Sequence, residues 1–314
     1  MHGSWAGSML AALLATLARP GWWGLALAAF LVRGGFLLVI FPILSLPTAA
    51  GITNAVAPPV EDVILGRTSA GGVLGWSLLV AALMAVLYLV LHAAAWLDMA
   101  LLREATAADE LDLRWSPAHP SASTGVAVRL LAHIPTMAAL GYASYRIIGV
   151  LFLELTAPGD TGTSLVVRVL AQAVDAPLAV ALTWLLGETV GGLAARRVAA
   201  GETVPGAFAR SSRQVLSPRG LATLALTMLA LGALLVPFLL VAGQAWEHVR
   251  IALLDDAGFP LVVSGLVLLV STWVLGLALL GALLAWRATA WTVQVAPRPV
   301  AVTQPMLQAS EPSR

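Results

Sequence analysis

Three pairs of ionisable residues are spaced almost symmetrically about a turn in the middle of the chain. The turn centres on Asp160 and separates two long apolar segments. On two antiparallel helices, residues at equal distances from the turn lie at one depth, so the spacing predicts three ion pairs along one hairpin. The pairs are Arg146 with Asp175, Glu154 with Arg168, and His133 with Glu188. Such pairs either hold a hairpin together or relay protons, and we favour the structural role because a relay needs a carboxylate free to titrate.

Arg33 is an unpaired charge in the middle of the first apolar segment. The matching depth of the second segment, near Val86, offers no acid. Asp175 is the only acid that the sequence places deep in a segment, so we expect Arg33 to share it with Arg146. This predicted cluster carries a net positive charge and would attract an anionic headgroup or substrate. It is the best candidate for a functional position.

These charges are exceptions in a chain that is 60% hydrophobic and only 11% charged over 314 residues. A soluble domain has roughly 25% charged residues. Segments of about 20 apolar residues can cross a bilayer as helices. Six segments qualify: 24–46, 73–97, 129–153, 165–187, 221–243 and 261–286. We therefore predict an all-α, polytopic transmembrane helical bundle over residues 1–291, followed by a disordered cytoplasmic tail over residues 292–314.

The arginines alternate between the connecting segments. Residues 1–23, 98–128, 188–220 and 287–314 hold eleven of the 17 arginines, whereas residues 47–72, 154–164 and 244–260 hold only Arg67 and Arg250. Cytoplasmic loops carry the excess of positive charge, so both termini are predicted to be cytoplasmic. The chain has no lysine, which is typical of a GC-rich bacterial genome, so we expect a multi-pass protein of the bacterial inner membrane.

The six segments form three hairpins that recur at a nearly constant interval. A shorter helical stretch and then proline precede the first segment of each hairpin. These stretches lie at residues 10–17 before Pro20, at residues 99–102 before Pro117 and Pro120, and at residues 208–216 before Pro218. The pattern reflects either three repeats of a hairpin, each with a cytoplasmic interfacial helix, or chance similarity in a chain rich in alanine, leucine and glycine, and we favour the repeats.

The loop between the fourth and fifth segments holds five arginines. They are Arg196, Arg197, Arg210, Arg213 and Arg219. These charges either enforce the topology or bind anionic lipid, and we favour topology while keeping them as candidate lipid contacts. The expected partners are membrane lipids and another membrane protein, with no nucleic acid.

Several enzyme classes lack their essential residues. Without cysteine there is no thiolate nucleophile or iron–sulfur cluster, and without lysine there is no P-loop or Schiff base. No Gly-x-Ser-x-Gly or His-Glu-x-x-His motif occurs, and no two of the five histidines have metal-ligand spacing on one helix. Asp109, Glu110 and Asp112 form an acidic group that either binds a divalent ion or lies solvated in a loop, and we favour the solvated loop. We predict no catalysis, no metal and no cofactor.

The loop sequence Ala194-Ala-Arg-Arg-Val-Ala-Ala-Gly-Glu202, followed by Ala207 and Arg213, resembles the cytoplasmic loops of bacterial six-span membrane families. One of these is the membrane domain that accompanies some glycerophosphodiester phosphodiesterases. The resemblance covers this loop only and implies a helical bundle of hairpin repeats. It implies no phosphodiesterase activity, because the chain has no catalytic domain of that kind.

Two functions fit these features. The first is a non-catalytic scaffold or accessory subunit of a membrane complex, and the alternative is a transporter or lipid-handling protein that uses the buried Arg/Asp cluster. A cavity that reaches Arg33 would favour the alternative, whereas a sealed, ion-paired core would favour the scaffold.

Overall fold

The computed structural model describes residues 4–43, 66–67, 69–111, 113, 121–156, 165–255 and 258–296, and every regular element within them is a helix. The predicted all-α helical bundle is thus confirmed. Five helices are long and apolar enough to cross a membrane, and a sixth crossing forms if the helix pair bent by 96° near the N-terminus counts as one span. The chain is accordingly a multi-pass membrane protein.

The first unit begins with a broken span. Its elements are α1 (Trp5–Leu17), α2 (Pro20–Phe30), the π-helix η1 (Leu31–Gly35), α3 (Phe36–Ile40), the short 3₁₀ helix η2 (Phe41–Ile43) and the long helix α5 (Ala70–Thr106). Pro20 starts α2 after the 96° bend, because proline is tolerated in the first turn of a helix. Gly34 has a φ of 98° and interrupts the helix again, so the predicted span 24–46 is not one continuous helix.

The second unit has two helix breaks next to prolines. Its elements are η3 (Asp109–Leu111), α6 (Ala122–Ala132), α7 (Ile134–Thr156), α8 (Leu165–Gln172) and α9 (Asp175–Ala199). A proline ring clashes with the carbonyl four residues earlier and donates no hydrogen bond. Pro135 therefore separates α6 from α7, and Pro177 separates α8 from α9. The predicted spans 129–153 and 165–187 are each divided in this way.

The third unit is the most regular. It consists of α10 (Val204–Val215), α11 (Pro218–Leu254) and α12 (Phe259–Val295). Ser217 caps α11 by accepting a hydrogen bond from the backbone N–H of Gly220, at 3.1 Å. The α12 helix continues past residue 291, where the disordered tail was predicted to begin, because Thr292 is buried and bonded within the protein. Residues 297–314 lie outside the described part of the chain.

The units share one plan, in which a short helix precedes two long segments. The short helices are α1, α6 and α10. The short helix predicted at residues 99–102 is wrong, since these residues continue α5, and α6 takes that place after Pro120. An apolar run carries α5 past Asp98 through Leu101 and Leu102, both of which are buried.

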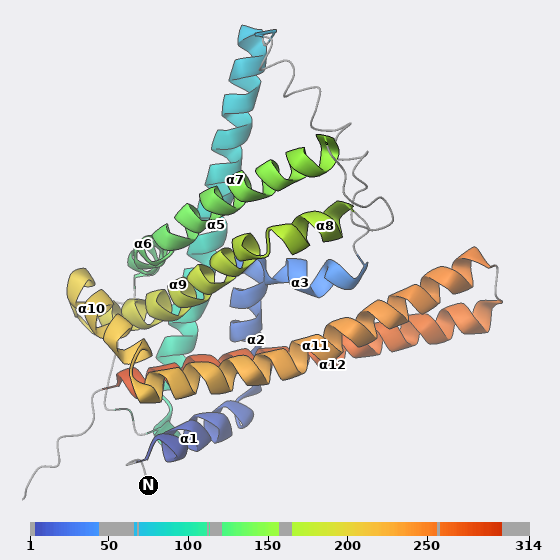
Figure 1. The fold of residues 1–314 in the computed structure, drawn as a ribbon. Coiled ribbons are helices and arrows are strands. Elements are labelled where there is room, and N and C mark those ends of the chain that lie inside the picture. Colours follow the sequence, from blue (N-terminus) through green and yellow to red (C-terminus); the bar gives the residue numbers. More distant parts are fainter. Residues whose placement is uncertain are drawn as a thin grey trace, which may run out of the picture.

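The three units meet at one end and diverge at the other. In Figure 1 the short helices lie toward the left of the view, and the far ends of α5, α7 and the α11–α12 hairpin point in different directions. At the shared end, α2 packs against both α5 and α12, and α9 packs against α6, α10 and α12. Close approach depends on small residues, as at Gly281, where a Cβ atom would lie 2.8 Å from the carbonyl oxygen of Trp23.

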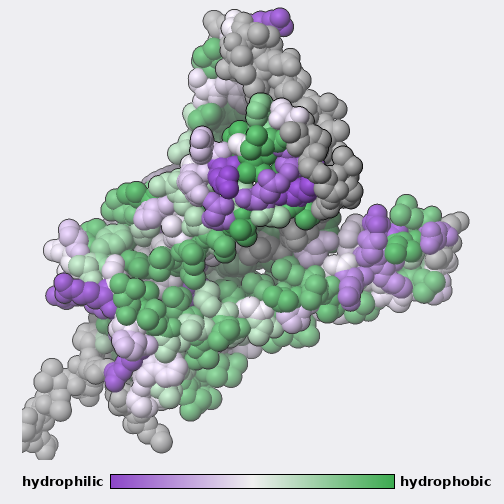
Figure 2. Space-filling model, viewed as in Figure 1, coloured by the Kyte–Doolittle hydropathy of each residue, from purple (hydrophilic) through white to green (hydrophobic). Residues whose placement is uncertain are grey.

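The diverging arms expose apolar surface. Only 11% of the most apolar stretch of α5 is buried within the protein. In Figure 2 green surface extends along α9 and the α11–α12 hairpin, whereas purple residues gather near the tip of that hairpin and at the end where α10 lies. Apolar arms with polar ends are suited to a bilayer.

Candidate functional site

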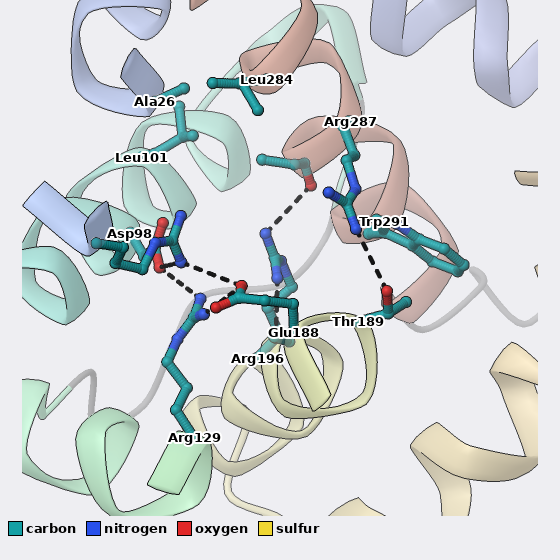
Figure 3. Close-up of a pocket in the computed structure, with 13 residues that line it drawn as sticks. Ala26, Asp98, Leu101, Arg129, Glu188, Thr189, Arg196, Leu284, Arg287 and Trp291 are labelled. Atoms are coloured by element: carbon teal, nitrogen blue, oxygen red, sulfur yellow. Dashed lines mark hydrogen bonds and ion pairs between the residues drawn. The ribbon is translucent and has the colours of Figure 1, made fainter. Parts of the chain in front are cut away.

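A cluster of charged side chains lies where the three units meet. We call it the charged junction; its members are Arg33 from η1, Asp98 from α5, Arg129 from α6, Glu188 and Arg196 from α9, and Arg287 from α12. Figure 3 shows these helices converging on one pocket. Residues far apart in the sequence are thereby brought together, with Arg33 and Arg287 at its two extremes.

Two carboxylates at the charged junction each contact two arginines. Arg33 Nη1 lies 2.9 Å from Asp98 Oδ2 and 3.5 Å from Glu188 Oε2. Arg129 Nη1 lies 3.1 Å from Glu188 Oε2, and its Nη2 donates to Asp98 Oδ2. These four residues form a network that links the first unit, through η1 and α5, to the second unit, through α6 and α9.

Helix geometry positions these groups at one level. Asp98 lies eight residues before the end of α5 at Thr106, and Arg287 lies eight residues before the end of α12 at Val295. At 1.5 Å per residue both are about 12 Å from their helix ends. The wider turn of η1 presents Arg33 to the same level, with its Nε donating to the carbonyl of Ala29 at 3.1 Å.

Arg196 and Arg287 have no carboxylate partner among the described residues. Arg196 donates to Thr292 Oγ1 at 3.1 Å, to the carbonyl of Gly192 at 2.8 Å and to the carbonyl of Ala288 at 3.4 Å. Arg287 donates to Thr189 Oγ1 at 3.3 Å. Every one of these acceptors is a neutral oxygen, so both guanidinium charges lack a counter-charge in direct contact.

A cavity of about 80 Å³ opens among these side chains. One water needs about 10–15 Å³, so the cavity accommodates a group of several heavy atoms. Figure 3 shows Ala26, Leu101 and Leu284 together on one side, whereas Arg129, Glu188 and Arg196 lie on the other. The cavity thus has one apolar wall and one charged wall.

Trp291 adds a further donor beside this cavity. Its side chain lines the cavity and is 4% exposed, and its indole Nε1 has no hydrogen-bond partner among the described residues. Indole and guanidinium groups only donate hydrogen bonds. Donors therefore outnumber acceptors at the charged junction.

Arg129 belongs to α6, a helix too short to be a candidate span. Burial acts to lower the pKa of Arg129, but the nearby carboxylates of Asp98 and Glu188 raise it above its ordinary value. The guanidinium is thus held in its charged form by the two acids that it contacts.

The structure brings together the three pairs that the hairpin spacing predicts. Arg168 Nε lies 2.7 Å from Glu154 Oε2, Arg146 Nε lies 3.6 Å from Asp175 Oδ2, and His133 Nε2 lies 3.7 Å from Glu188 Oε1. The Glu154 pair is buried and receives a further hydrogen bond from Gln172. His133 joins the edge of the charged junction, with its Nδ1 2.8 Å from the carbonyl oxygen of Arg129.

The predicted cluster of Arg33, Arg146 and Asp175 is not formed. Arg33 contacts Asp98 and Glu188 instead. Arg146 and Asp175 form a separate pair, 44% and 46% exposed, in which the Tyr142 hydroxyl also donates to Asp175. The expectation failed because it assigned Asp98 to a loop, whereas α5 continues through that residue as a helix.

The five loop arginines have different environments. Arg196 lies at the charged junction, and Arg197 contacts Glu202 Oε1 at 3.1 Å and Gln214 Oε1 at 2.6 Å. Arg210 also contacts Glu202 at 3.1 Å and is 66% exposed. Arg213 and Arg219 are exposed. Arg196 and Arg197 are thus both largely buried, with the Arg197 side chain 15% exposed, and Arg210, Arg213 and Arg219 are the exposed members of the five.

No group of three or more His, Asp or Glu side chains in the described residues is placed to hold a metal ion. Asp109 lies in η3, whereas Asp112 lies outside the described residues, as does the side chain of Glu110. The acidic group considered in the sequence therefore stays a prediction.

Sequence reasoning missed Asp98, Arg129 and Arg287 as members of the site. Asp98 was placed one residue beyond a predicted span, and Arg129 and Arg287 were at the edges of two others. One signal was available, since the residues that follow Asp98 and Arg287 continue the apolar pattern for more than one turn. Comparison with family models, curated proteins and solved structures finds no match to this chain, so the resemblance of the arginine-rich loop stays a prediction.

Proposed function

We propose that this multi-pass membrane protein is a non-catalytic, lipid-handling protein that binds an anionic headgroup at the charged junction. The observation that carries the proposal is that Arg196 and Arg287 contact only neutral oxygens beside the cavity. A charge inside a membrane protein needs a partner, because the low dielectric makes an unpaired charge costly by several kcal/mol. An anion in the cavity would supply that partner.

The residue types suit phosphate. A guanidinium presents planar, paired donors that match phosphate oxygens, and it keeps its charge at all ordinary pH values. Arg196 comes from α9 and Arg287 from α12, so two helices approach the cavity with such donors. The apolar wall formed by Ala26, Leu101 and Leu284 suits the glycerol and acyl portion of a lipid.

We place the charged junction on the cytoplasmic side of a bacterial inner membrane. The arginine-rich connections lie at the same end as α1, α6 and α10, and cytoplasmic loops carry the excess of positive charge (Figure 1). That leaflet is rich in anionic lipid, so the exposed Arg213 and Arg219 would concentrate the ligand near the cavity.

The test is ligand-dependent stability of the purified protein. In a neutral detergent, we expect an anionic phospholipid to raise the midpoint of thermal unfolding and a zwitterionic lipid to leave it unchanged, because only the former supplies the missing charge. Arg287→Gln should abolish the increase. Arg250→Gln is the matched control, because Arg250 pairs with Glu247 at the far end of α11. Equal effects of both lipids on both variants would contradict the proposal.

A scaffold or accessory-subunit role is the second candidate, and the exposed arms favour it. Leu83 and Met84 in the middle of α5 are 59% and 60% exposed, and no described part of the chain covers them. A photo-crosslinking amino acid at position 84 would distinguish the candidates in living cells. One reproducible protein adduct there supports a partner, whereas lipid adducts alone support the lipid-handling role.

A further inference from the structure

We infer that the charged junction is selective for a phosphate that carries two negative charges, such as a phosphomonoester headgroup or inorganic phosphate, over a singly charged phosphodiester. The inference rests on the proposed anion site and adds the charge and chemical class of its ligand.

Positive charges exceed negative charges at the cavity. Four arginines line the cavity, whereas Asp98 and Glu188 are the only acids among the described residues that line it. Each acid contacts both Arg33 and Arg129, so those four residues balance one another. Arg196 and Arg287 then account for an excess of two positive charges. A phosphodiester would neutralise one of them, and a phosphate dianion would neutralise both.

Arg196 and Arg287 have more hydrogen-bond donors than they use. A guanidinium has five N–H groups. Arg287 makes one hydrogen bond, to Thr189, and Arg196 makes three, to Thr292, Gly192 and Ala288. Several N–H groups of these two arginines thus lack an acceptor in the described structure. A phosphomonoester offers three terminal oxygens as acceptors, one more than a phosphodiester.

Arg196 and Arg287 reach the cavity from different helices. Arg196 extends from α9 to acceptors on α12, and Arg287 extends from α12 to an acceptor on α9. The two side chains therefore cross between the same helices beside the cavity, as Figure 3 shows. A tetrahedral group in the cavity can be approached from both helices at once, which favours an ion with oxygens on several sides.

The pH dependence of binding has a definite sign. A phosphomonoester loses its second proton with a pKa near 6, so its dianion fraction rises about tenfold between about pH 5 and about pH 8. The charged groups that line the cavity are Arg33, Asp98, Arg129, Glu188, Arg196 and Arg287, and His133 contacts Glu188 beside it. Any of these that titrates makes the site less positive as pH rises, which weakens anion binding. An anion affinity that increases with pH must therefore come from deprotonation of the ligand and not of the protein.

The experiment measures binding of four probes to the purified protein in neutral detergent: inorganic phosphate, sulfate, phosphatidic acid and phosphatidylglycerol. We expect phosphatidic acid to bind about tenfold tighter than phosphatidylglycerol, because one additional charge-assisted hydrogen bond is worth about that factor. Between about pH 5 and about pH 8, binding of phosphate and phosphatidic acid should rise. Sulfate, doubly charged throughout, should stay level or weaken.

Arg196→Gln and Arg287→Gln should each reduce the preference for phosphatidic acid, and Arg250→Gln should preserve it. If a junction variant fails to fold, the lipid comparison and the pH profile of the unmodified protein still decide the matter.

The outcomes separate this inference from the proposed function. If phosphatidylglycerol binds as tightly as phosphatidic acid and the pH profile is flat, selectivity for a dianion is wrong while the lipid site stands. If phosphate binds and neither lipid does, the dianion inference holds and the lipid-handling proposal fails. Absence of binding by all four probes overturns both.

Discussion

Asp98 and Glu188 supply the negative charge at the lining of the cavity, and each is shared between Arg33 and Arg129. Both side chains are mostly buried, at 12% and 20% exposure. Removing one partner from a buried ion pair leaves the other charge uncompensated, which costs more than the pair contributes. A single substitution at the charged junction is therefore expected to reduce the stability of the protein more than one in the exposed pair of Glu247 and Arg250.

Asp98→Asn is expected to lower the free energy of unfolding by about 3 kcal/mol, because it leaves two buried arginines with one carboxylate between them. Unfolding in mixed detergent micelles measures the change. The double variant Arg33→Gln/Asp98→Asn should be less destabilised than the sum of the two single variants, since the pair is removed together.

Glu247→Gln is the control for this substitution, because the exposed pair that it breaks lies far from the charged junction. We expect no measurable change in stability. A loss for Glu247→Gln as large as that for Asp98→Asn would mean that burial at the charged junction is not the cause.

At the scale of elements, the break between α2 and α3 brings Arg33 to the charged junction. Gly34 has a φ of 98°, a conformation that residues with a side chain adopt at a cost. A Cβ atom at Gly34 would meet no atom within 4 Å, so the strain would come from the backbone alone.

Gly34→Ala is therefore expected to destabilise the protein by about 1–2 kcal/mol. Gly232→Ala is the matched control, because that glycine is also free of neighbours within 4 Å but lies inside the helix α11. There alanine should be neutral or stabilising by up to about 1 kcal/mol. Equal effects in a thermal unfolding assay would show that the helix break at Gly34 is not required.

The crossing of α2 and α12 depends on the absence of a side chain at Gly281. A Cβ atom there would lie 2.8 Å from the backbone oxygen of Trp23, which a side-chain rotation cannot relieve. We expect Gly281→Ala to separate the two helices and to destabilise the protein by about 1–3 kcal/mol. Because Leu284 and Arg287 follow on α12, the variant should also weaken binding of the anionic probe. Unchanged stability and unchanged binding would contradict this close contact.

At the scale of the whole molecule, the number of crossings decides where the termini lie. Five long helices alone would place the termini on opposite sides, and a sixth crossing through the bent first unit would place them on the same side. We expect both termini in the cytoplasm, following the distribution of arginine. Reporter fusions to each terminus, one active only inside the cell and one only outside, check this. A C-terminus on the outer side would reduce the crossings to an odd number.

The sequence by itself determined the class of protein and the local pairs. Long apolar stretches must be helical in a membrane because only a helix satisfies its own backbone hydrogen bonds there, and this reasoning needs no neighbours. Equal spacing about a turn likewise predicted Arg168 with Glu154, since both lie on one hairpin.

Only the tertiary structure decided which charges meet. Asp98 comes from the first unit, Glu188 from the second and Arg287 from the third, and their convergence on one cavity depends on where each helix ends and how the units pack. Asp98 was assigned to a loop because a hydropathy pattern ends a span at a charged residue. The helix α5 instead continues to Thr106, because its backbone hydrogen bonds and its packing continue beyond Asp98. The buried charge of Asp98 is tolerated within α5 because its partners, Arg33 and Arg129, lie on other helices. The sequence around Asp98 does not show which residues of other helices will contact it.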